Sequence, residues 1–360
     1  MAHIQLKNIS KTFGSHTALK GLDFEIRDGE FFVMLGETGA GKTTTLRLIA
    51  GPEKPTEGSI LIDGVDVADW GAAERDVALV LQQYSLYPRY TVRENLEFPL
   101  KPKIRRLPDA EIKERVDRVA KTLRIEHLLD RKTDKLSGGE MQRVSIGRAI
   151  VRKPRVFLMD EPLSALDAKL REALRTELKN LQMNLGATFL FVTHDQIEAM
   201  SMGDRIGVLN NGHLVQTGTP NEIYNNPKNT FVARSVGSPP MNLLEGSMRD
   251  GRAIVAPVKF ELPYAGGNSG AATDGRPIIF GIRPEDLYLE TGAPVEARVH
   301  DVENHGVEKI VTLDAGDTML RATVPARTSV AIDEAVRFAW NQDKVILFDR
   351  ASGVSLRHAD

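Results

Sequence analysis

The stretch 36–44 contains the residue types that bind a chain of phosphates. Its glycines let backbone N–H groups turn toward phosphate oxygens, because a Cβ atom would intrude there. Lys42 brings a positive charge to the outer phosphates, and the hydroxyl of Thr43 is a natural ligand for Mg²⁺. The spacing is that of a P-loop, G-x-x-x-x-G-K-[ST]. In order, the stretch reads Gly36, Glu37, Thr38, Gly39, Ala40, Gly41, Lys42, Thr43 and Thr44.

Two acids and a histidine follow apolar runs further along the chain. Asp160 and Glu161 come directly after the run 156–159, and His194 comes shortly after the run 188–192. In open α/β sheets, ligands bind at the carboxyl ends of the strands. Acids at such a place rarely serve only the fold, because burying a carboxylate is costly without a cation or hydrogen-bond donors. These three side chains are therefore candidates for the chemistry of the site.

Pro162 follows this pair of acids. A proline disfavours the helical conformation in the residue before it. We therefore expect Glu161 to have an extended backbone that holds its side chain away from any helix. Among the 8 histidines of the chain, only His194 has such a context; the others, such as His127, are expected at the surface.

Hydrophobic periodicity indicates the strands that position these residues. Alternating apolar and polar residues over 3–9 and 17–26 predict antiparallel strands. The run 31–35 predicts the strand that leads into the P-loop, and the run 77–81 predicts a strand buried on both faces. Gln82 lies just beyond that strand. The aromatic loop that follows it favours a contact surface, with amphipathic anchors at Tyr84, Tyr87 and Tyr90.

Capping signals predict a mainly helical segment over about 88–153. Thr91 with Glu94, and Ser137 with Glu140, form capping-box patterns at two helix starts. Pro108 is expected to open a helix between them. A later helix ended by Gly186 is predicted from one apolar face, formed by Leu166, Leu170, Leu174, Leu178, Leu181 and Leu185.

The sequence pattern changes near residue 236. The stretch 237–240, Gly-Ser-Pro-Pro, is expected to be a linker. Beyond it, short alternating runs recur between Gly, Asp and Asn turns, at 295–299, 309–313, 319–324, 335–340 and 345–348. This pattern predicts a small antiparallel barrel or sandwich. We therefore expect two domains, 1–235 and 236–360.

Composition excludes several classes of protein. The chain has 360 residues and no cysteine, so disulfides and thiolate metal sites are ruled out. The net charge of −2 implies no general affinity for polyanions, so nucleic acid is not expected as a partner. The first ten residues do not read as a signal peptide, and no run approaches the roughly 18 apolar residues of a membrane span. Any action at a membrane is expected to occur by docking.

Together, these motifs resemble the ATP-binding cassette of ABC transporters over residues 1–235. The most specific part is the signature stretch 136–139, Leu-Ser-Gly-Gly, which has no counterpart in GTPases or kinases. The remaining residues resemble the β-rich regulatory domain of ATPase subunits from carbohydrate uptake systems, through the stretches 236–242 and 281–285. The implied fold is an α/β P-loop NTPase with a mixed sheet core, an antiparallel β part and a helical subdomain. A small all-β, OB-like barrel would follow it.

The resemblance also implies a mechanism. Two copies would face each other head to tail and enclose two ATP molecules, each held by the P-loop of one copy and by Ser137, Gly138, Gly139 and Glu140 of the other. Thr43, Gln82 and Asp160 would hold Mg²⁺. Glu161 would orient and deprotonate the attacking water, while Lys42 and His194 would neutralise the γ-phosphate. Asp167, in the stretch Ser164-Ala165-Leu166-Asp167, would link the two sites, and Phe13 would stack on adenine.

The implied partners are membrane permease subunits, docking near Tyr84, Tyr87 and Tyr90, and indirectly an extracytoplasmic solute-binding protein. The chain would lie peripherally at the cytoplasmic face of the plasma membrane, with Gln82 joining the metal to the docking loop. The chain departs from the family pattern at one clear place: Glu140 stands where the signature usually has glutamine. Phe13 also stands where tyrosine is common.

Two other classes of function remain open beside import of a sugar. One is an ABC-type ATPase that works in DNA repair or on ribosomes, although the coiled-coil insertion, cysteine zinc sites or second cassette of such proteins are absent. The other is a regulatory binding module in which ATP hydrolysis is secondary. The solute is also open between a sugar, glycerol phosphate, a polyamine and an inorganic oxyanion, because selectivity would lie in the permease and the binding protein.

Overall fold

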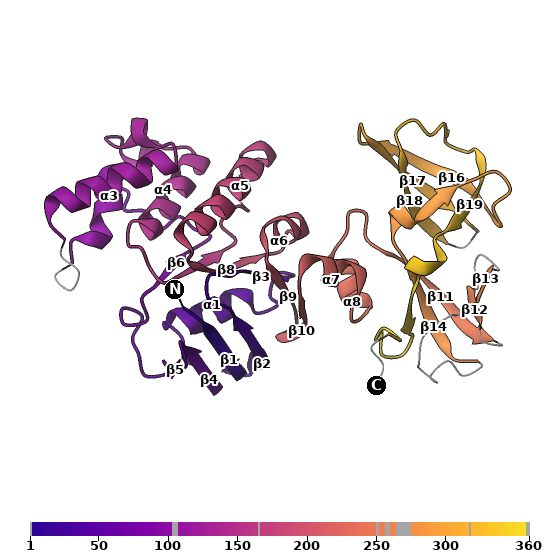
Figure 1. Ribbon diagram of the computed structural model, residues 1–360, viewed down its shortest axis with the longest axis horizontal. Helices are drawn as coiled ribbons and strands as arrows, with labels where there is room; N and C mark the ends of the chain where they lie inside the picture. Colours follow the sequence, from indigo (N-terminus) through magenta and orange to yellow (C-terminus); the bar gives the residue numbers. More distant parts are fainter. Residues whose placement is uncertain are drawn as a thin grey trace. The chain divides into compact units, whose positions relative to one another are not determined.

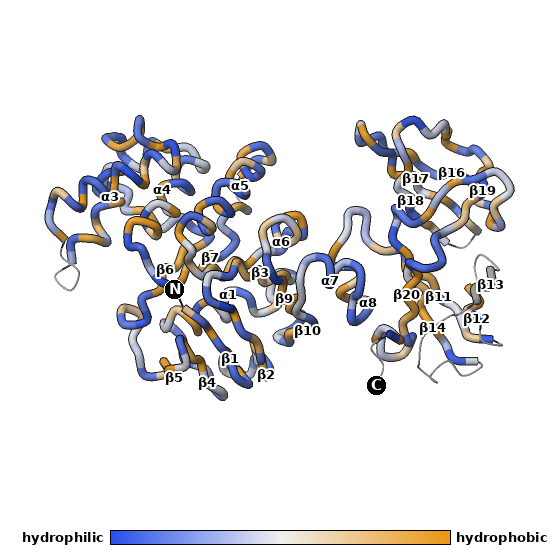
Figure 2. Tube along the Cα trace, in the orientation of Figure 1, coloured by the Kyte–Doolittle hydropathy of each residue, from blue (hydrophilic) through white to orange (hydrophobic). Residues whose placement is uncertain are grey.

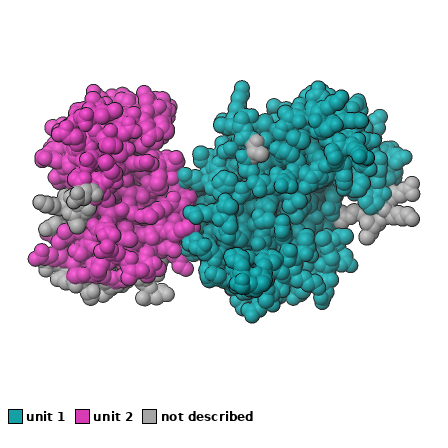
Figure 3. Space-filling model, turned by 180° about the vertical axis from the view of Figure 1, so that it is seen from behind, with its two compact units in different colours: residues 1–220 teal, residues 221–360 magenta. Residues whose placement is uncertain are grey.

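The computed structural model describes residues 2–102, 107–164, 166–249, 252–255, 260–263, 275–316 and 318–357. The chain divides into two compact units, 1–220 and 221–360 (Figures 1 and 3). The division differs from the domain limits expected from sequence, because residues 221–235 fall in the second unit. Among the described residues, none of the helices has the length and apolarity that a membrane span requires.

The first unit contains two sheets. The antiparallel sheet has the order β2-β1-β4-β5, formed by β1 (Ile4–Phe13), β2 (His16–Ile26), β4 (Glu57–Ile62) and β5 (Val65–Asp66). The second sheet has the order β10-β9-β3-β8-β7-β6, formed by β3 (Phe31–Gly36), β6 (Val77–Val80), β7 (Val156–Asp160), β8 (Thr188–Thr193), β9 (Arg205–Asn210) and β10 (His213–Gly218). It is a mixed sheet, because β10 runs antiparallel to β9 and the other neighbours are parallel.

The core of this unit brings three strand ends together. Every residue of β3, β7 and β8 is buried, which explains why these strands have no alternating pattern. Helix α1 (Lys42–Ala50) lies between the two sheets (Figure 1), and one apolar cluster joins it to both. In the pairing register, Leu35 lies beside Thr193 and Asp160 lies beside Val192. The ends of β3, β7 and β8 therefore meet at one edge of the sheet.

The helical part of the first unit lies between β6 and β7. It contains α2 (Val92–Glu97), α3 (Asp109–Thr122) and α4 (Gly138–Ile150), with 3-10 turns at Phe98–Leu100, Glu126–Leu128 and Thr133–Lys135. Both predicted capping boxes are confirmed, at Thr91 and at Ser137. In Figure 2, α3 and α4 alternate between hydrophilic and hydrophobic colours along their length, as amphipathic helices do.

Helices α5 (Ala168–Leu185) and α6 (Gln196–Met202) follow β7 and β8. Gly186 ends α5 with a φ of 61°, as predicted. The predicted apolar face differs from the structure at its two ends. Leu166 is buried but precedes the helix, and Leu185 is 37% exposed.

The second unit begins with α7 (Pro220–Asn225) and α8 (Thr230–Ser235) and continues as two antiparallel sheets. One has the order β13-β12-β11-β14-β20, formed by β11 (Asn242–Arg249), β12 (Arg252–Val255), β13 (Phe260–Pro263), β14 (Pro277–Ile282) and β20 (Ile346–Asp349). The other has the order β15-β19-β16-β17-β18, formed by β15 (Leu287–Leu289), β16 (Val295–Asn304), β17 (Glu308–Asp314), β18 (Met319–Pro325) and β19 (Ala335–Trp340).

One apolar core spans both sheets of the second unit. The rings of Phe280 and Trp340, from different sheets, lie 5.1 Å apart. The five alternating runs predicted from the sequence are all strands. The strands between residues 242 and 289 were not predicted.

Candidate functional site

The P-loop connects the end of β3 to the start of α1. Gly41 precedes the helix with a φ of 111°, and a Cβ atom there would lie 2.5 Å from the side chain of Leu19. Only glycine fits this position. A Cβ atom at Gly39, whose φ is 84°, would meet nothing within 4 Å. The loop backbone therefore borders open space beside a helix N-terminus, an arrangement that suits phosphate oxygens.

Lys42 is buried at the centre of the site and has three partners. Its Nζ atom donates to the carbonyl oxygens of Gly36 at 2.9 Å and Glu37 at 3.0 Å. It also forms an ion pair with Oε1 of Glu161 at 3.1 Å. An ammonium group has three donors, so contact with a phosphate requires the exchange of at least one of these partners. The two carbonyls belong to the backbone of the loop, whereas Glu161 is the side-chain partner among the three.

Thr43 and Asp160 provide oxygen ligands of the kind that Mg²⁺ prefers. The hydroxyl of Thr43 donates to Oδ1 of Asp160 at 3.1 Å. Burial raises the pKa of Asp160 above its usual value, and the hydrogen bond from Thr43 opposes this effect. The described residues contain no group of three His, Cys, Asp or Glu side chains that forms a metal site on its own. The pair fits a Mg²⁺ site of the type completed by substrate phosphates and water.

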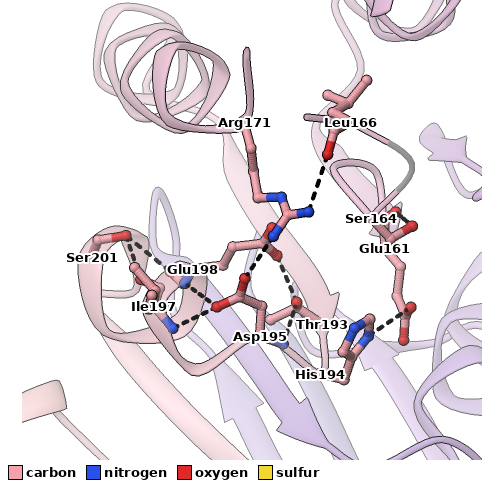
Figure 4. A network of polar contacts seen from close by, with 10 residues as sticks. All are labelled: Glu161, Ser164, Leu166, Arg171, Thr193, His194, Asp195, Ile197, Glu198 and Ser201. Carbon is pink, nitrogen blue, oxygen red and sulfur yellow. Dashed lines mark hydrogen bonds and ion pairs between the residues drawn. The ribbon is translucent and has the colours of Figure 1, made fainter. Parts of the chain in front are cut away.

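Glu161 and His194 meet beside the P-loop. Oε2 of Glu161 lies 2.9 Å from Nδ1 of His194 (Figure 4). The expected extended backbone of Glu161 is wrong, because its φ is 43°. Two contacts override the influence of the following proline. The N–H of Glu161 donates to the carbonyl of Val192 at 3.1 Å, and the hydroxyl of Ser164 donates to the carbonyl of Glu161 at 2.9 Å.

Gln82 and Phe13 lie outside this set of contacts. Gln82 is exposed after β6, and no hydrogen bond joins it to Thr43 or Asp160, all of which the structure describes. Phe13 lies at the end of β1 with 43% of its surface exposed, and Nζ of Lys11 lies 4.7 Å from the centre of its ring. An exposed aromatic face of this kind can stack on a base.

The predicted signature forms the N-terminus of α4. Oε2 of Glu140 accepts hydrogen bonds from the backbone N–H of Ser137 at 2.8 Å and from its hydroxyl at 2.9 Å. The backbone hydrogen bond from Ser137 lowers the pKa of Glu140, so this carboxylate is ionised at neutral pH. A Cβ atom at Gly139 would lie 2.2 Å from the side chain of Leu170, so the glycine permits α4 to pack against α5.

Asp167 caps α5, and its carboxylate accepts from the N–H of Leu170 at 2.9 Å. Ala165, in the same predicted stretch, lies outside the described residues. Within the described part of the first unit, no hydrogen bond or ion pair joins residues 137–140 or Asp167 to the P-loop. One chain therefore brings Lys42, Thr43, Asp160, Glu161 and His194 together and leaves the signature apart from them.

The aromatic loop after Gln82 forms an exposed cluster with a helix turn. The rings of Tyr87 and Phe98 lie 4.4 Å apart, and the rings of Tyr87 and Tyr90 lie 5.4 Å apart. All three side chains are about 40% exposed. Sequence reasoning missed Phe98, which lies outside the loop. Tyr84 is half-buried instead, and its hydroxyl lies 3.1 Å from the position of a Cβ atom at Gly138.

Helix α4 holds this loop in place. The guanidinium of Arg148 donates to the carbonyl of Ser85 at 2.6 Å and lies 5.5 Å from the ring centre of Tyr87. The amide of Asn95 donates to the carbonyl of Tyr87 at 3.2 Å. The loop is thus joined to the helix that begins at the signature.

Comparison with known proteins identifies three matching sequence families. Residues 19–164 match the ABC transporter family, residues 237–287 match the MalK OB fold domain, and residues 280–348 match the TOBE domain. The chain resembles solved ATP-binding cassettes, among them a dimeric cassette in a post-hydrolysis state bound to ADP and Pi. The identity is 34% and the TM-score is 0.55, over 60% of this chain and 98% of that one.

Relatives match nearly the whole chain. The trehalose/maltose import ATP-binding protein MalK of Thermococcus litoralis is 47% identical, over 99% of this chain and 100% of the relative. The sn-glycerol-3-phosphate import ATP-binding protein UgpC of Ruegeria pomeroyi is 43% identical, over 98% of this chain and 99% of the relative. The sulfoquinovosyl glycerol transport ATP-binding protein SmoE of Agrobacterium fabrum is also 43% identical, over 99% and 100%. The chain therefore belongs to the ABC transporter family as an ATP-hydrolysing subunit, with a MalK-type OB domain and a TOBE domain after its cassette.

Proposed function

We propose that this chain energises the import of a sugar or a related solute through ATP-driven closure of a head-to-tail dimer. The observation that carries the proposal is the separation within one chain between the P-loop cluster and the signature. Lys42 and Glu161 contact each other, whereas Ser137 has no contact with either among the described residues. A second copy would supply the missing helix N-terminus, which is suited to bind the γ-phosphate.

In this proposal each side chain has a defined role. Glu161 accepts a proton from the attacking water and orients that water with one carboxylate oxygen, while His194 fixes the other oxygen. Lys42 binds the outer phosphates after exchanging its contact with Glu161. Thr43 and Asp160, with Gln82, hold Mg²⁺, which when bound neutralises charge on the β- and γ-phosphates. Phosphoryl transfer needs positioning and neutralisation of this kind more than covalent chemistry.

The remaining residues of the P-loop, residues 36–41 and Thr44, would cradle the phosphates through their backbone. Phe13 would stack on adenine. Asp167 would contact the second copy and link its site to that of its own chain. These assignments follow the family pattern, and the exposure of Phe13 supports its part.

We further propose that permease subunits dock on the exposed cluster of Tyr87, Tyr90 and Phe98, with Tyr84 and Arg148 joining that cluster to α4. The chain would thus act peripherally at the cytoplasmic face of the plasma membrane. An extracytoplasmic solute-binding protein would deliver the solute. Relatives named for trehalose/maltose, sulfoquinovosyl glycerol and glycerol-3-phosphate support a sugar or a glycerol derivative as the solute class.

The proposal is tested by affinity purification of the full chain from solubilised membranes, followed by ATPase measurement with and without the recovered permease. Permease subunits of a sugar-type importer should co-purify and should make ATP hydrolysis depend on the solute-loaded binding protein. A Lys42→Ala variant, which should still dock but not hydrolyse ATP, serves as the control. Recovery of no membrane protein, together with a chain that stays monomeric in ATP and Mg²⁺, would contradict the proposal.

A further inference from the structure

Arg171, in the first turn of α5, joins two loops that carry site residues. One terminal nitrogen of its guanidinium donates to Oδ2 of Asp195 at 3.2 Å. The other donates to the backbone carbonyl of Leu166 at 3.1 Å (Figure 4). Arg171 itself has no place in the P-loop, the signature or any other motif recognised in the sequence.

Both partners of Arg171 are direct neighbours of a site residue in the chain. Leu166 precedes Asp167, the cap of α5. Asp195 follows His194, the partner of Glu161. One guanidinium therefore contacts both the residue before Asp167 and the residue after His194.

Asp195 is tied to the start of α6 and to Thr193, so it shifts together with its neighbours in the chain. It caps α6, because Oδ1 accepts from the N–H of Ile197 at 2.7 Å and from that of Glu198 at 3.3 Å. Its own N–H donates to the hydroxyl of Thr193 at 2.9 Å. Arg171 occupies the second carboxylate oxygen, so a shift of the guanidinium moves a segment with few other degrees of freedom.

The charges around this contact make arginine the suitable residue. Thr193 also donates to the buried carboxylate of Glu198 at 2.6 Å, and burial raises the pKa of that carboxyl group. The positive charge of Arg171 acts on both Asp195 and Glu198. A guanidinium presents its donors in a rigid fork and can hold a carboxylate and a carbonyl at once, which an ammonium on a flexible stem does poorly.

We propose that Arg171 is a positioning residue that couples Leu166 and the adjacent Asp167 to the orientation of His194. The coupling rests on the proposed function, in which Asp167 contacts the second copy and His194 fixes one carboxylate oxygen of Glu161. Displacement of Leu166 by the second copy is transmitted through the guanidinium to Asp195 and so to the imidazole. His194 is thereby held against Glu161 only when Leu166 of its own chain is in place.

The test is steady-state ATP hydrolysis by the full chain in three variants. Arg171→Gln should lower kcat by about 10- to 100-fold with little change in KM for ATP, because a small misplacement of a reacting group has effects of this size. Arg171→Lys, which keeps the charge and loses the fork, should fall between Arg171→Gln and the unchanged protein. Arg175→Gln is the matched control: it removes the same charge one turn later in α5, and in the described part of the chain Arg175 contacts neither Leu166 nor Asp195. An unchanged kcat in Arg171→Gln, or an equal loss in Arg175→Gln, would overturn the proposal.

A double-mutant cycle with His194→Ala separates coupling from general damage to the fold. Single-turnover rates, which extend to slow variants, should show that Arg171→Gln has no further effect once His194 is absent. The thermal stability lost through Arg171→Gln should be the same with and without His194. Multiplicative losses in rate would overturn the coupling.

If His194→Ala alone leaves the rate unchanged, the proposed role of the histidine fails, and the coupling fails with it. If that variant is slow but Arg171 acts independently, only the coupling fails. Should Arg171→Gln not fold, Arg171→Lys takes its place in the cycle.

Discussion

Glu161 uses both of its carboxylate oxygens within the site. Oε1 pairs with Lys42 at 3.1 Å and Oε2 lies 2.9 Å from His194. A water-activating base must be free on at least one oxygen when water arrives. When Lys42 moves its contact from Glu161 to a phosphate, Oε1 of Glu161 would become available to water. Binding of ATP would therefore also make the base ready to act.

Glu161→Gln should reduce ATP hydrolysis by about 10²- to 10⁴-fold, the usual contribution of a general base. The amide keeps the shape of the side chain, so ATP binding should remain and an ATP-bound dimer should persist. Hydrolysis is measured by phosphate release and the dimer by size-exclusion chromatography in ATP. Glu172→Gln, which changes an exposed acid of α5, is the control. Near-normal hydrolysis by Glu161→Gln would remove Glu161 from the catalytic role.

Asp160→Asn should stabilise the first unit while weakening Mg²⁺-dependent ATP binding. Burial raises the pKa of Asp160, so the ionised form is disfavoured in the fold. This group therefore adds stability as the pH falls through the raised pKa and costs stability above it. The neutral amide removes that cost and still accepts from Thr43. Scanning calorimetry at pH 7 should show a higher unfolding temperature; in a unit of this size, each ~1 kcal/mol of stability corresponds to roughly 2–4 °C. A lower unfolding temperature would contradict this account.

Glu140→Gln should tighten ATP-driven dimerisation about threefold at low salt. Unit like charges about 7 Å apart in water repel by roughly 0.6 kcal/mol, which corresponds to about a threefold change in affinity. The capping box should survive, because a glutamine oxygen can accept the same bonds from Ser137. The advantage should shrink at high salt, where exposed charges are screened.

The measurement for Glu140→Gln is the dimer fraction against ATP concentration at two ionic strengths, in the hydrolysis-blocked Glu161→Gln background. Glu114→Gln, an exposed change on α3, controls for net charge. An unchanged or weaker dimer would mean that contacts of the carboxylate with the nucleotide outweigh its repulsion.

The sequence predicts which residue types form the candidate site but not how they pair. A phosphate site demands glycine, lysine and threonine at fixed spacing, so residue type and spacing together predict Lys42 and Thr43 as members of it. The ion pair between Lys42 and Glu161 depends on the left-handed backbone at Glu161. Pro162 predicted an extended backbone at Glu161 instead, because the preference of a residue before proline does not take into account the hydrogen bond from Glu161 to Val192.

At the scale of elements, the aromatic loop and α4 form one mechanical connection. Arg148 and Asn95 attach the loop to helices at two points, and Tyr84 reaches the start of α4. Tyr87 is therefore linked to the helix of the signature through side chains that lie outside the sheet.

Tyr87→Ala should uncouple transport from hydrolysis in the assembled transporter. Central aromatic anchors contribute about 2 kcal/mol or more at interfaces, which is about thirtyfold in affinity. Basal hydrolysis by the isolated chain should remain, because the ring lies outside the P-loop cluster. Solute uptake in reconstituted vesicles is compared with that of Tyr288→Ala, an exposed tyrosine of the second unit. Normal permease binding and normal uptake by Tyr87→Ala would exclude this loop as the docking surface.

Strands were predicted where the apolar residues either alternate or form a continuous run. The residues of β11 do neither. Leu244 packs into the core between the sheets, while its neighbour Leu243 packs against a second cluster with Ala233 and Phe348. A strand that buries adjacent residues on opposite faces does not alternate. The same second cluster explains the difference in the domain boundary.

At the scale of the whole chain, α8 belongs with the second unit. Ala233 is fully buried in the cluster with Met241, Ile346 and Phe348. Arg283 reinforces the attachment by donating to the carbonyls of Ala233 and Val236. The second compact unit therefore begins before the linker at 237–240, whereas the match to the MalK OB fold domain begins at residue 237.

This packing predicts how truncated chains behave. A fragment of residues 1–220 should be soluble, whereas a fragment of residues 1–235 should associate, because its α8 carries apolar side chains without their partners. Light scattering and size-exclusion chromatography compare the two fragments at equal concentration. The reverse order of solubility would support the boundary expected from the sequence.

The left-handed backbone of Glu161 has a consequence for the way variants of this protein are ranked. A side chain other than glycine in that conformation costs roughly 1–2 kcal/mol. Glu161→Gly relieves this strain, and although it removes the ion pair between Lys42 and Glu161, Lys42 keeps its two carbonyl acceptors. Such a variant should accumulate to a higher level in cells while hydrolysing no ATP. A screen that scores protein abundance would therefore favour variants without Glu161. Only a screen for growth on the transported solute would select for the glutamate.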